Sequence, residues 1–95
     1  MAKYEVMFII NPTLEDAAKD VVVEKVQEII NADGTVANVD VWGMRKLAYP
    51  IHKKNEGYYV VVEFDASADL PKELDRRLKI SDDVMRHIII NREAK

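Results

Sequence analysis

The chain has 95 residues, no cysteine and an apolar share of 48%, with 14 basic and 17 acidic side chains that give a net charge of −3. This size suits one domain over residues 1–95, and the lack of cysteine excludes disulfides, thiolate metal sites and cysteine nucleophiles. The negative charge argues against a domain that binds nucleic acid alone, because phosphate contacts need a positive field. With no apolar signal segment at its start, the chain is expected to belong to the reducing cytosol and to have no membrane span.

The first predicted element is a strand over residues 3–10, "KYEVMFII". It has apolar side chains on both faces, those of one parity being Tyr4, Val6, Phe8 and Ile10. Met7 and Ile9 occupy the opposite parity. After "NPT", Thr13 and Asp16 have the spacing of a helix-capping pair, so we expect a helix to begin there.

That helix is predicted to end near Asp33 and Gly34, where a glycine can close the last turn. Apolar residues recur along it at steps of three and four and form one stripe, namely Leu14, Ala17, Ala18, Val21, Val22, Val26, Ile29 and Ile30. The stripe is typical of an amphipathic helix that packs on a core.

Residues 36–51 are predicted to form a long second strand that is interrupted at Trp42 and Gly43, where the glycine suggests a bulge. Pro50 indicates an edge strand, since proline has no backbone N–H to donate to a neighbouring strand. A turn of composition "HKKNEG" leads into residues 58–64, "YYVVVEF", whose almost continuous apolar run is typical of a buried central strand.

A second helix is predicted from Asp69, with Leu70, Leu74 and Leu78 on its inner face, followed by a last strand at "VMRHIII". The order strand-helix-strand-strand-helix-strand predicts an α+β ferredoxin-like sandwich, in which two helices cover one face of a four-stranded antiparallel sheet. The expected core comprises Tyr4, Val6, Phe8, Ile10, Leu14, Val22, Val26, Ile29, Ile30, Val60, Val62, Leu74 and Leu78.

The positive charge is concentrated in residues 42–59, which carry four basic side chains and one acidic side chain. The four are Arg45, Lys46, Lys53 and Lys54. They could be a solvated edge that discourages aggregation, or they could contact RNA with Trp42 and Tyr49 stacking on bases. A second, looser basic set includes Arg86 and Arg92.

The face of the sheet away from the helices is predicted to be apolar rather than polar, with Met7, Ile9, Ile88 and Ile90 on it. Either these residues dock a protein, or loops or a shifted register cover them. His52 and His87 have no carboxylate or second histidine at ligand spacing, and the glycines stand singly, so we expect neither metal, cofactor nor catalysis. The residues alone leave open an RNA- or protein-binding module, a self-associating regulatory domain, or a small ligand-binding enzyme that uses the open face.

Three stretches of the sequence are characteristic: "YEVMFIINP", "WGMRKLAYPIHKKNEGYYVVVEF" and "ISDDVMRHIII". Over nearly its whole length the chain resembles the bacterial small-subunit ribosomal protein S-six family. The resemblance implies a ferredoxin-like structural constituent of the small ribosomal subunit, not an enzyme. It also implies pairing with ribosomal protein S-eighteen as a heterodimer that binds the central domain of small-subunit ribosomal RNA.

Carried over residue by residue, the resemblance makes Arg45, Lys46, Lys53 and Arg86 candidates for RNA contact. Lys54 and Arg92 join them as neighbouring cations. The expected partner contacts are Met7, Ile9, Trp42, Tyr49, Ile88 and Ile90. The chain stops soon after the last strand, at "NREAK", whereas some relatives continue into a longer tail.

Overall fold

A computed structural model describes residues 2–51 and 54–92. The elements follow the predicted order and are β1 (Ala2–Ile10), α1 (Asp16–Asn31), β2 (Gly34–Ile51), β3 (Lys54–Ala66), α2 (Asp69–Ile80) and β4 (Val84–Asn91). The four strands form one antiparallel sheet in the order β2-β3-β1-β4. The predicted ferredoxin-like sandwich is therefore confirmed.

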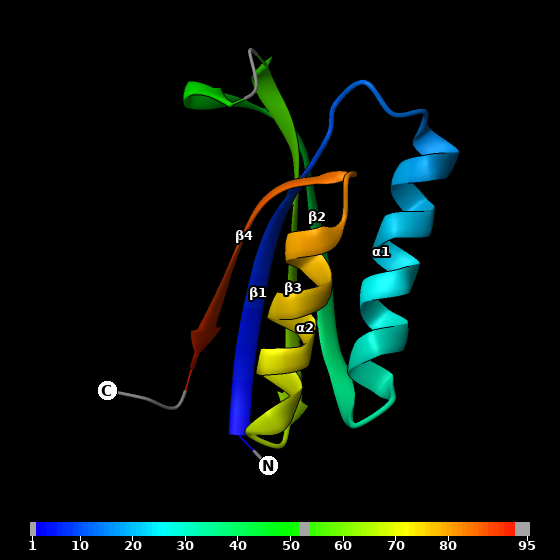
Figure 1. Cartoon of the computed structure of the whole chain (residues 1–95), viewed down its shortest axis with the longest axis vertical. Coiled ribbons are helices and arrows are strands. Elements are labelled where there is room, and N and C mark those ends of the chain that lie inside the picture. The colour runs from blue at the N-terminus through cyan, green and yellow to red at the C-terminus, as the bar shows by residue number, and fades with distance from the viewer. Residues whose placement is uncertain (1, 52–53, 93–95) are drawn as a thin grey trace.

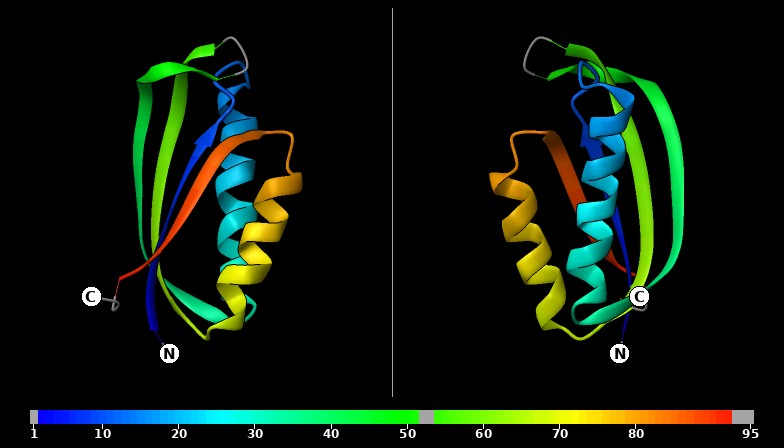
Figure 2. Two further views of the ribbon diagram at one scale, coloured as in Figure 1. Left: turned by 60° about the vertical axis from the view of Figure 1, so that its left-hand side comes forward. Right: turned by 90° about the vertical axis from the view of Figure 1, so that its right-hand side faces the viewer.

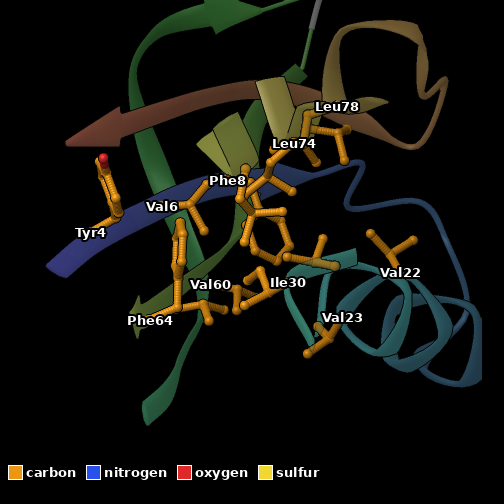
Figure 3. Packing of buried hydrophobic residues seen from close by; sticks show 14 of the residues in the cluster. Tyr4, Val6, Phe8, Val22, Val23, Ile30, Val60, Phe64, Leu74 and Leu78 are labelled. Carbon is orange, nitrogen blue, oxygen red and sulfur yellow. The ribbon is translucent and has the colours of Figure 1, made fainter. Parts of the chain in front are cut away.

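Both helices lie on the same side of the sheet and leave its other face uncovered (Figures 1 and 2). The core fills the space between these two layers, and its side chains converge from β1, β3, α1 and α2 (Figure 3). Phe8, Ile10, Ile30 and Leu74 are completely or almost completely buried there. Of the expected core residues, Leu14 and Ile29 are partly buried against this cluster instead of lying inside it.

The strand register fixes which side chains face the helices. Val6 pairs with Val62 and Phe8 with Val60, and all four side chains are buried under the helices. Because alternate side chains of a strand point to opposite faces, Met7 and the residues paired with it, Val61 and Ile88, lie on the open face. The predicted parity of the first strand is confirmed.

β2 is an edge strand and β3 a central one, as Pro50 and the apolar run of β3 predicted. The β2–β3 register shifts between Val41 and Gly43, and Gly43 has a φ of 80°. That left-handed backbone conformation favours glycine, and the bulge turns the intervening Trp42 toward the open face. The interruption predicted at these two residues is thus a bulge in a continuous strand.

The beginning of α1 differs from the prediction. The helix starts at Asp16 with Glu15 as its N-cap, and Glu15 makes no side-chain capping bond. Thr13 does not cap the helix, because its backbone N–H and its hydroxyl both donate to Asn11 Oδ1, at 3.0 and 2.8 Å. Asparagine commonly binds the backbone two residues ahead in this way, and here that local turn replaces the capping box.

The buried stripe of α1 is also rotated from the predicted one. Val23 is buried whereas Val21 is 45% exposed. The stem of Lys19 is buried on the same side, with its ammonium 4.9 Å from the centre of the Tyr58 ring. A lysine can cover apolar surface with its stem while its charge contacts an aromatic ring, and sequence periodicity does not reveal this.

The far half of the β2–β3 hairpin bends over the end of β1 (Figure 1). Gly57 lies so close to Ile9 that a Cβ atom added to it would fall 2.2 Å from Ile9 Cγ2. Leu47 packs beside them, and Ile9 is only 5% exposed. The expectation that Ile9 offers an open docking surface is therefore wrong, since the hairpin covers it.

Candidate functional site

The candidate site is the open face of the sheet, where the register aligns side chains in rows across the strands. One row runs from Arg86 on β4 through Ile9 and Tyr59 to Gly43 on β2. The next joins Ile88, Met7, Val61 and Asp40, and the third joins Ile90, Glu5, Glu63 and Asn38. Neighbouring strands are about 4.8 Å apart, so each row spans about 14 Å.

A basic and aromatic cluster, formed by Trp42, Arg45, Lys46 and Tyr59, lines a shallow hollow of about 410 Å³ at the first row. The Trp42 and Tyr59 rings are nearly parallel, at an angle of 6° and a centroid distance of 6.3 Å. The Arg45 guanidinium lies 6.0 Å from the centre of the Trp42 ring. Stacked rings beside cations can receive a flat, negatively charged or electron-rich partner such as a nucleotide.

Trp42 is held in place by a further bond. Its indole N–H donates to Asp40 Oδ2 at 3.0 Å, while 45% of the residue remains exposed. Because the bulge, the stacking on Tyr59 and this hydrogen bond all constrain the ring, its exposed face is preorganised for contact. A binding partner would therefore lose little entropy in ordering it.

An apolar row occupies the middle of the open face. Ile88 is 41% exposed and Ile90 46%, Met7 is half-buried, and Val61 is buried between its neighbours. Exposed isoleucines on an edge strand, next to a half-buried methionine, leave apolar area that a partner could remove from water. The predicted apolar character of this face holds at Met7, Ile88 and Ile90.

The opposite end of the face is acidic by a small excess. Glu5, Glu63 and Asp65 project there from β1 and β3, next to the apolar row, and Lys3 lies opposite Asp65. Arg92 is at this end, with its Nη1 3.0 Å from Glu5 Oε1. It lies about 20 Å along the sheet from Arg86 and about 25 Å from Arg45 and Lys46, so it does not join these cations in one basic surface.

Some predicted site residues fall outside the structural description. Lys53 is outside the described residues, and so are the side chains of Lys54 and Tyr49, whose backbones lie in β3 and β2. Their assignments to RNA or partner contact remain sequence predictions. Arg45 and Lys46 are described and are exposed.

On the helix side, His87 Nε2 donates to Asp75 Oδ1 across 2.6 Å, a contact that links β4 to α2. This bond, followed by the one from Lys79, lowers the pKa of the Asp75 carboxyl. The pair ties the last strand to the second helix, and neither residue lines the hollow at the first row of the open face. Within residues 2–51 and 54–92, no group of three or more His, Asp or Glu side chains could hold a metal ion.

Sequence reasoning missed the contribution of Tyr59 and the contact between His87 and Asp75. In the sequence Tyr59 is simply part of an apolar strand, but it follows Tyr58 directly and so has the other parity, which places it on the open face. His87 and Asp75 lie on separate elements, so no local spacing in the sequence predicts their contact.

The fold and the open face together define a ferredoxin-like protein that offers binding surfaces rather than a catalytic pocket in its described part. The family model described as "Ribosomal protein S6" matches residues 3–91. The chain belongs to the ribosomal protein S6 family. It is a ribosomal protein of the small subunit and not an enzyme, and its place is the ribosome in the cytoplasm.

Individual relatives agree with this assignment. The small ribosomal subunit protein bS6 of Alkaliphilus oremlandii is 54% identical over 93 residues, covering 98% of this chain and 99% of that protein. The bS6 protein of Clostridium acetobutylicum is 54% identical over 94 residues, with the same coverage. The crystal structure of 30S ribosomal protein S6 from Thermotoga maritima superposes with a TM-score of 0.92 at 34% identity, over 96% of this chain and 87% of that one.

The family resemblance read from the sequence is thus confirmed, and so is the expectation of a non-enzymatic protein. In the part of the chain that the structure describes, neither helix is long and apolar enough to cross a membrane.

Proposed function

We propose that the chain binds small-subunit ribosomal RNA as one half of a heterodimer with ribosomal protein S-eighteen. The observation that carries this proposal is the division of the open face into a basic and aromatic end, an apolar middle and an acidic end. One face with three kinds of surface suits two different partners that meet side by side.

The basic and aromatic end is the proposed RNA contact. Arg45 and Lys46 are exposed and can neutralise phosphates, and Arg86 lies on the same row of the sheet. Trp42 offers an aromatic surface on which an unpaired base can stack. Lys53 and Lys54 follow in the same hairpin and remain candidates on sequence grounds.

The apolar row and the acidic end are the proposed protein contact. Met7, Ile88 and Ile90 would become desolvated in the complex, as anchors of protein interfaces do. Glu5 is paired with Arg92 and Asp65 lies opposite Lys3, so the carboxylates of Glu5, Glu63 and Asp65 leave a small negative excess that disfavours RNA and favours a basic protein. A partner with positive charge is therefore favoured at this end.

This arrangement predicts that the isolated chain binds RNA weakly. Its net charge of −3 supplies no long-range attraction to phosphate, and only a few cations cluster at the RNA end. Each phosphate contact adds about 0.7–0.9 to the slope of log affinity against log salt. A basic partner next to the acidic end would raise both the affinity and this slope.

The test is a salt titration of RNA affinity for the chain alone, for the heterodimer, and for two variants of the heterodimer. Replacing Arg45 and Lys46 with alanine should lower the salt slope by up to about two. The matched control replaces Lys25 and Lys72, which are exposed on α1 and α2 and give the same change in net charge. It should leave the slope unchanged.

Tight binding by the isolated chain would contradict the dependence on a partner. If the salt slope fell equally in both double variants, the chain would act through its net charge, and Arg45 and Lys46 would be removed from the RNA contact. An unchanged slope in the variant that lacks Arg45 and Lys46 would also remove them.

A further inference from the structure

The two helices carry a groove on the side of the molecule opposite the open face. It has a volume of about 850 Å³ and lies between the second half of α1 and the whole of α2. Its floor is apolar and includes Val26, Leu70 and Leu78, which also belong to the core. Ile80 stands at its rim and is 70% exposed, more than any other large apolar residue in the described part of the chain.

The rim of the groove is acidic. Its carboxylates are Glu28, Asp33, Asp69, Glu73 and Asp83. Two cations, Lys25 and Arg77, also line it, but Arg77 is engaged by Glu73 at 2.9 Å. The unpaired charge around the apolar floor is therefore negative.

Two carboxylates meet at one end of the groove. Asp33 follows the last turn of α1, which carries no basic residue, and Asp69 opens α2 beside it on the groove wall. The partial charges of the two helix ends that meet there have opposite signs and oppose each other. A cation reaching this end would therefore be attracted by the two carboxylates.

We propose that the groove docks a basic amphipathic helix of another protein. The apolar side chains of that helix would cover Ile80 and the groove floor, and its lysines or arginines would face the acidic rim. At 12 residues, α2 is about 18 Å long, which corresponds to an occupant of about three to four turns.

Other occupants fit less well. RNA would be repelled by the rim carboxylates, and a second copy of this chain would set its own acidic rim against this one. The groove lies on the helix side, and its lining does not include Trp42, Arg45 or Ile88. The proposal is therefore independent of the proposed RNA and partner contacts on the open face.

The experiment uses the full chain with labelled isoleucine, leucine and valine methyl groups. The probe is a synthetic helix of about 14 residues, built from lysine with leucines at three- and four-residue spacing. Peptides with glutamate in place of lysine, and with the same composition scrambled, are the matched controls. Methyl NMR shifts during titration report both the site and the affinity.

The helical lysine peptide should shift the methyls of Ile29, Leu78 and Ile80, and the two control peptides should not. Ile80→Lys should weaken binding at least about tenfold, and Asp33→Asn with Asp69→Asn should weaken it and flatten its salt dependence. Val41→Lys places a lysine at an exposed apolar position of β2 outside the groove and should leave affinity unchanged. No shifts at millimolar peptide, shifts centred on Ile88, equal binding of the scrambled or glutamate peptide, or full affinity in Ile80→Lys would each overturn the proposal.

Discussion

Replacing Gly57 with alanine tests how the hairpin is held against the sheet. The new Cβ would lie 2.2 Å from Ile9 Cγ2 and 3.5 Å from Leu47 Cδ2. Carbon atoms pack comfortably at about 3.5–4.0 Å, so Ile9 or the hairpin must move by more than about 1 Å. Leu47 needs no displacement, and the clash is therefore with Ile9 alone.

The expected cost follows from two opposing effects. Overpacking a filled site typically costs about 1–3 kcal/mol. Removing a glycine restricts the unfolded chain and returns about 0.4–1 kcal/mol. The steric effect is larger, because Ile9 is itself buried and cannot rotate into water, so the free energy of unfolding should fall by about 1–2 kcal/mol.

Urea denaturation measures this loss, and Asn55→Ala is the matched control. Asn55 is exposed on the same strand, so that change should stay within about 0.5 kcal/mol. Ile9→Ala removes the clashing Cγ2 atom and should cost about 2–5 kcal/mol alone. When Ile9→Ala and Gly57→Ala are combined, the loss of unfolding free energy should be smaller than the sum of the two single losses by about 0.5–3 kcal/mol. A stable Gly57→Ala chain, or strictly additive losses, would refute the close approach of the hairpin to Ile9.

Three further predictions concern the core, the helix surface and the open face. Leu74→Ala removes a completely buried side chain and should lower the unfolding free energy by about 2–5 kcal/mol in urea, whereas a loss below about 0.5 kcal/mol would place it outside the core. Hydrogen bonds from Arg76 and Arg77 lower the pKa of Glu73 from 4.5 to about 2. Because this pKa is lower in the folded than in the unfolded chain, ionised Glu73 stabilises the fold at pH values above 4.5, and the stabilisation is lost as pH falls from 4.5 toward 2. The stability difference between wild type and Glu73→Gln should therefore shrink across that pH range and stay constant above it. Ile88→Lys should leave the stability of the isolated chain nearly unchanged while weakening the proposed heterodimer at least about tenfold. Collapse of the fold with unchanged affinity per folded molecule would instead make Ile88 a core residue.

Much of the fold could be predicted because local pattern and tertiary structure agree. The parity of β1, the leucine spacing of α2 and the apolar run of β3 each point to the face that is buried in the structure. The edge position of β2 followed from Pro50, and the bulge from Gly43, since each of these residues restricts or permits one backbone conformation.

The features that sequence reasoning missed depend on contacts between distant segments. Ile9 has the parity of the open face but is covered by the bend of a hairpin about fifty positions later. Thr13 lost its predicted capping role to a bond with Asn11, a competition between two local motifs of similar strength. Tyr59 gained its role only because the bulge brings Trp42 over it.

The site was predictable in composition but not in layout. Arg45 and Lys46 stand out in sequence as part of a basic segment, yet the distance of Arg92 from them depends on the β1–β4 register. The acidic end of the face is likewise formed by side chains from two strands that are far apart in the sequence. The pairing of strands that are distant in the sequence forms both ends, and no local sequence pattern states which residues of those strands lie opposite each other.

The position of β1 between β3 and β4 has a consequence for the synthesis of the chain. β1 is made before its neighbour β4, and the Glu5–Arg92 contact joins residues 87 positions apart. Until β4 emerges, a nascent chain that has already paired β1 with β3 presents the other side of β1 as an unpaired edge, open to pairing with other chains. The sheet is therefore completed only after β4 has been made, and a chain cut short before Val84 would keep that edge and be prone to aggregation.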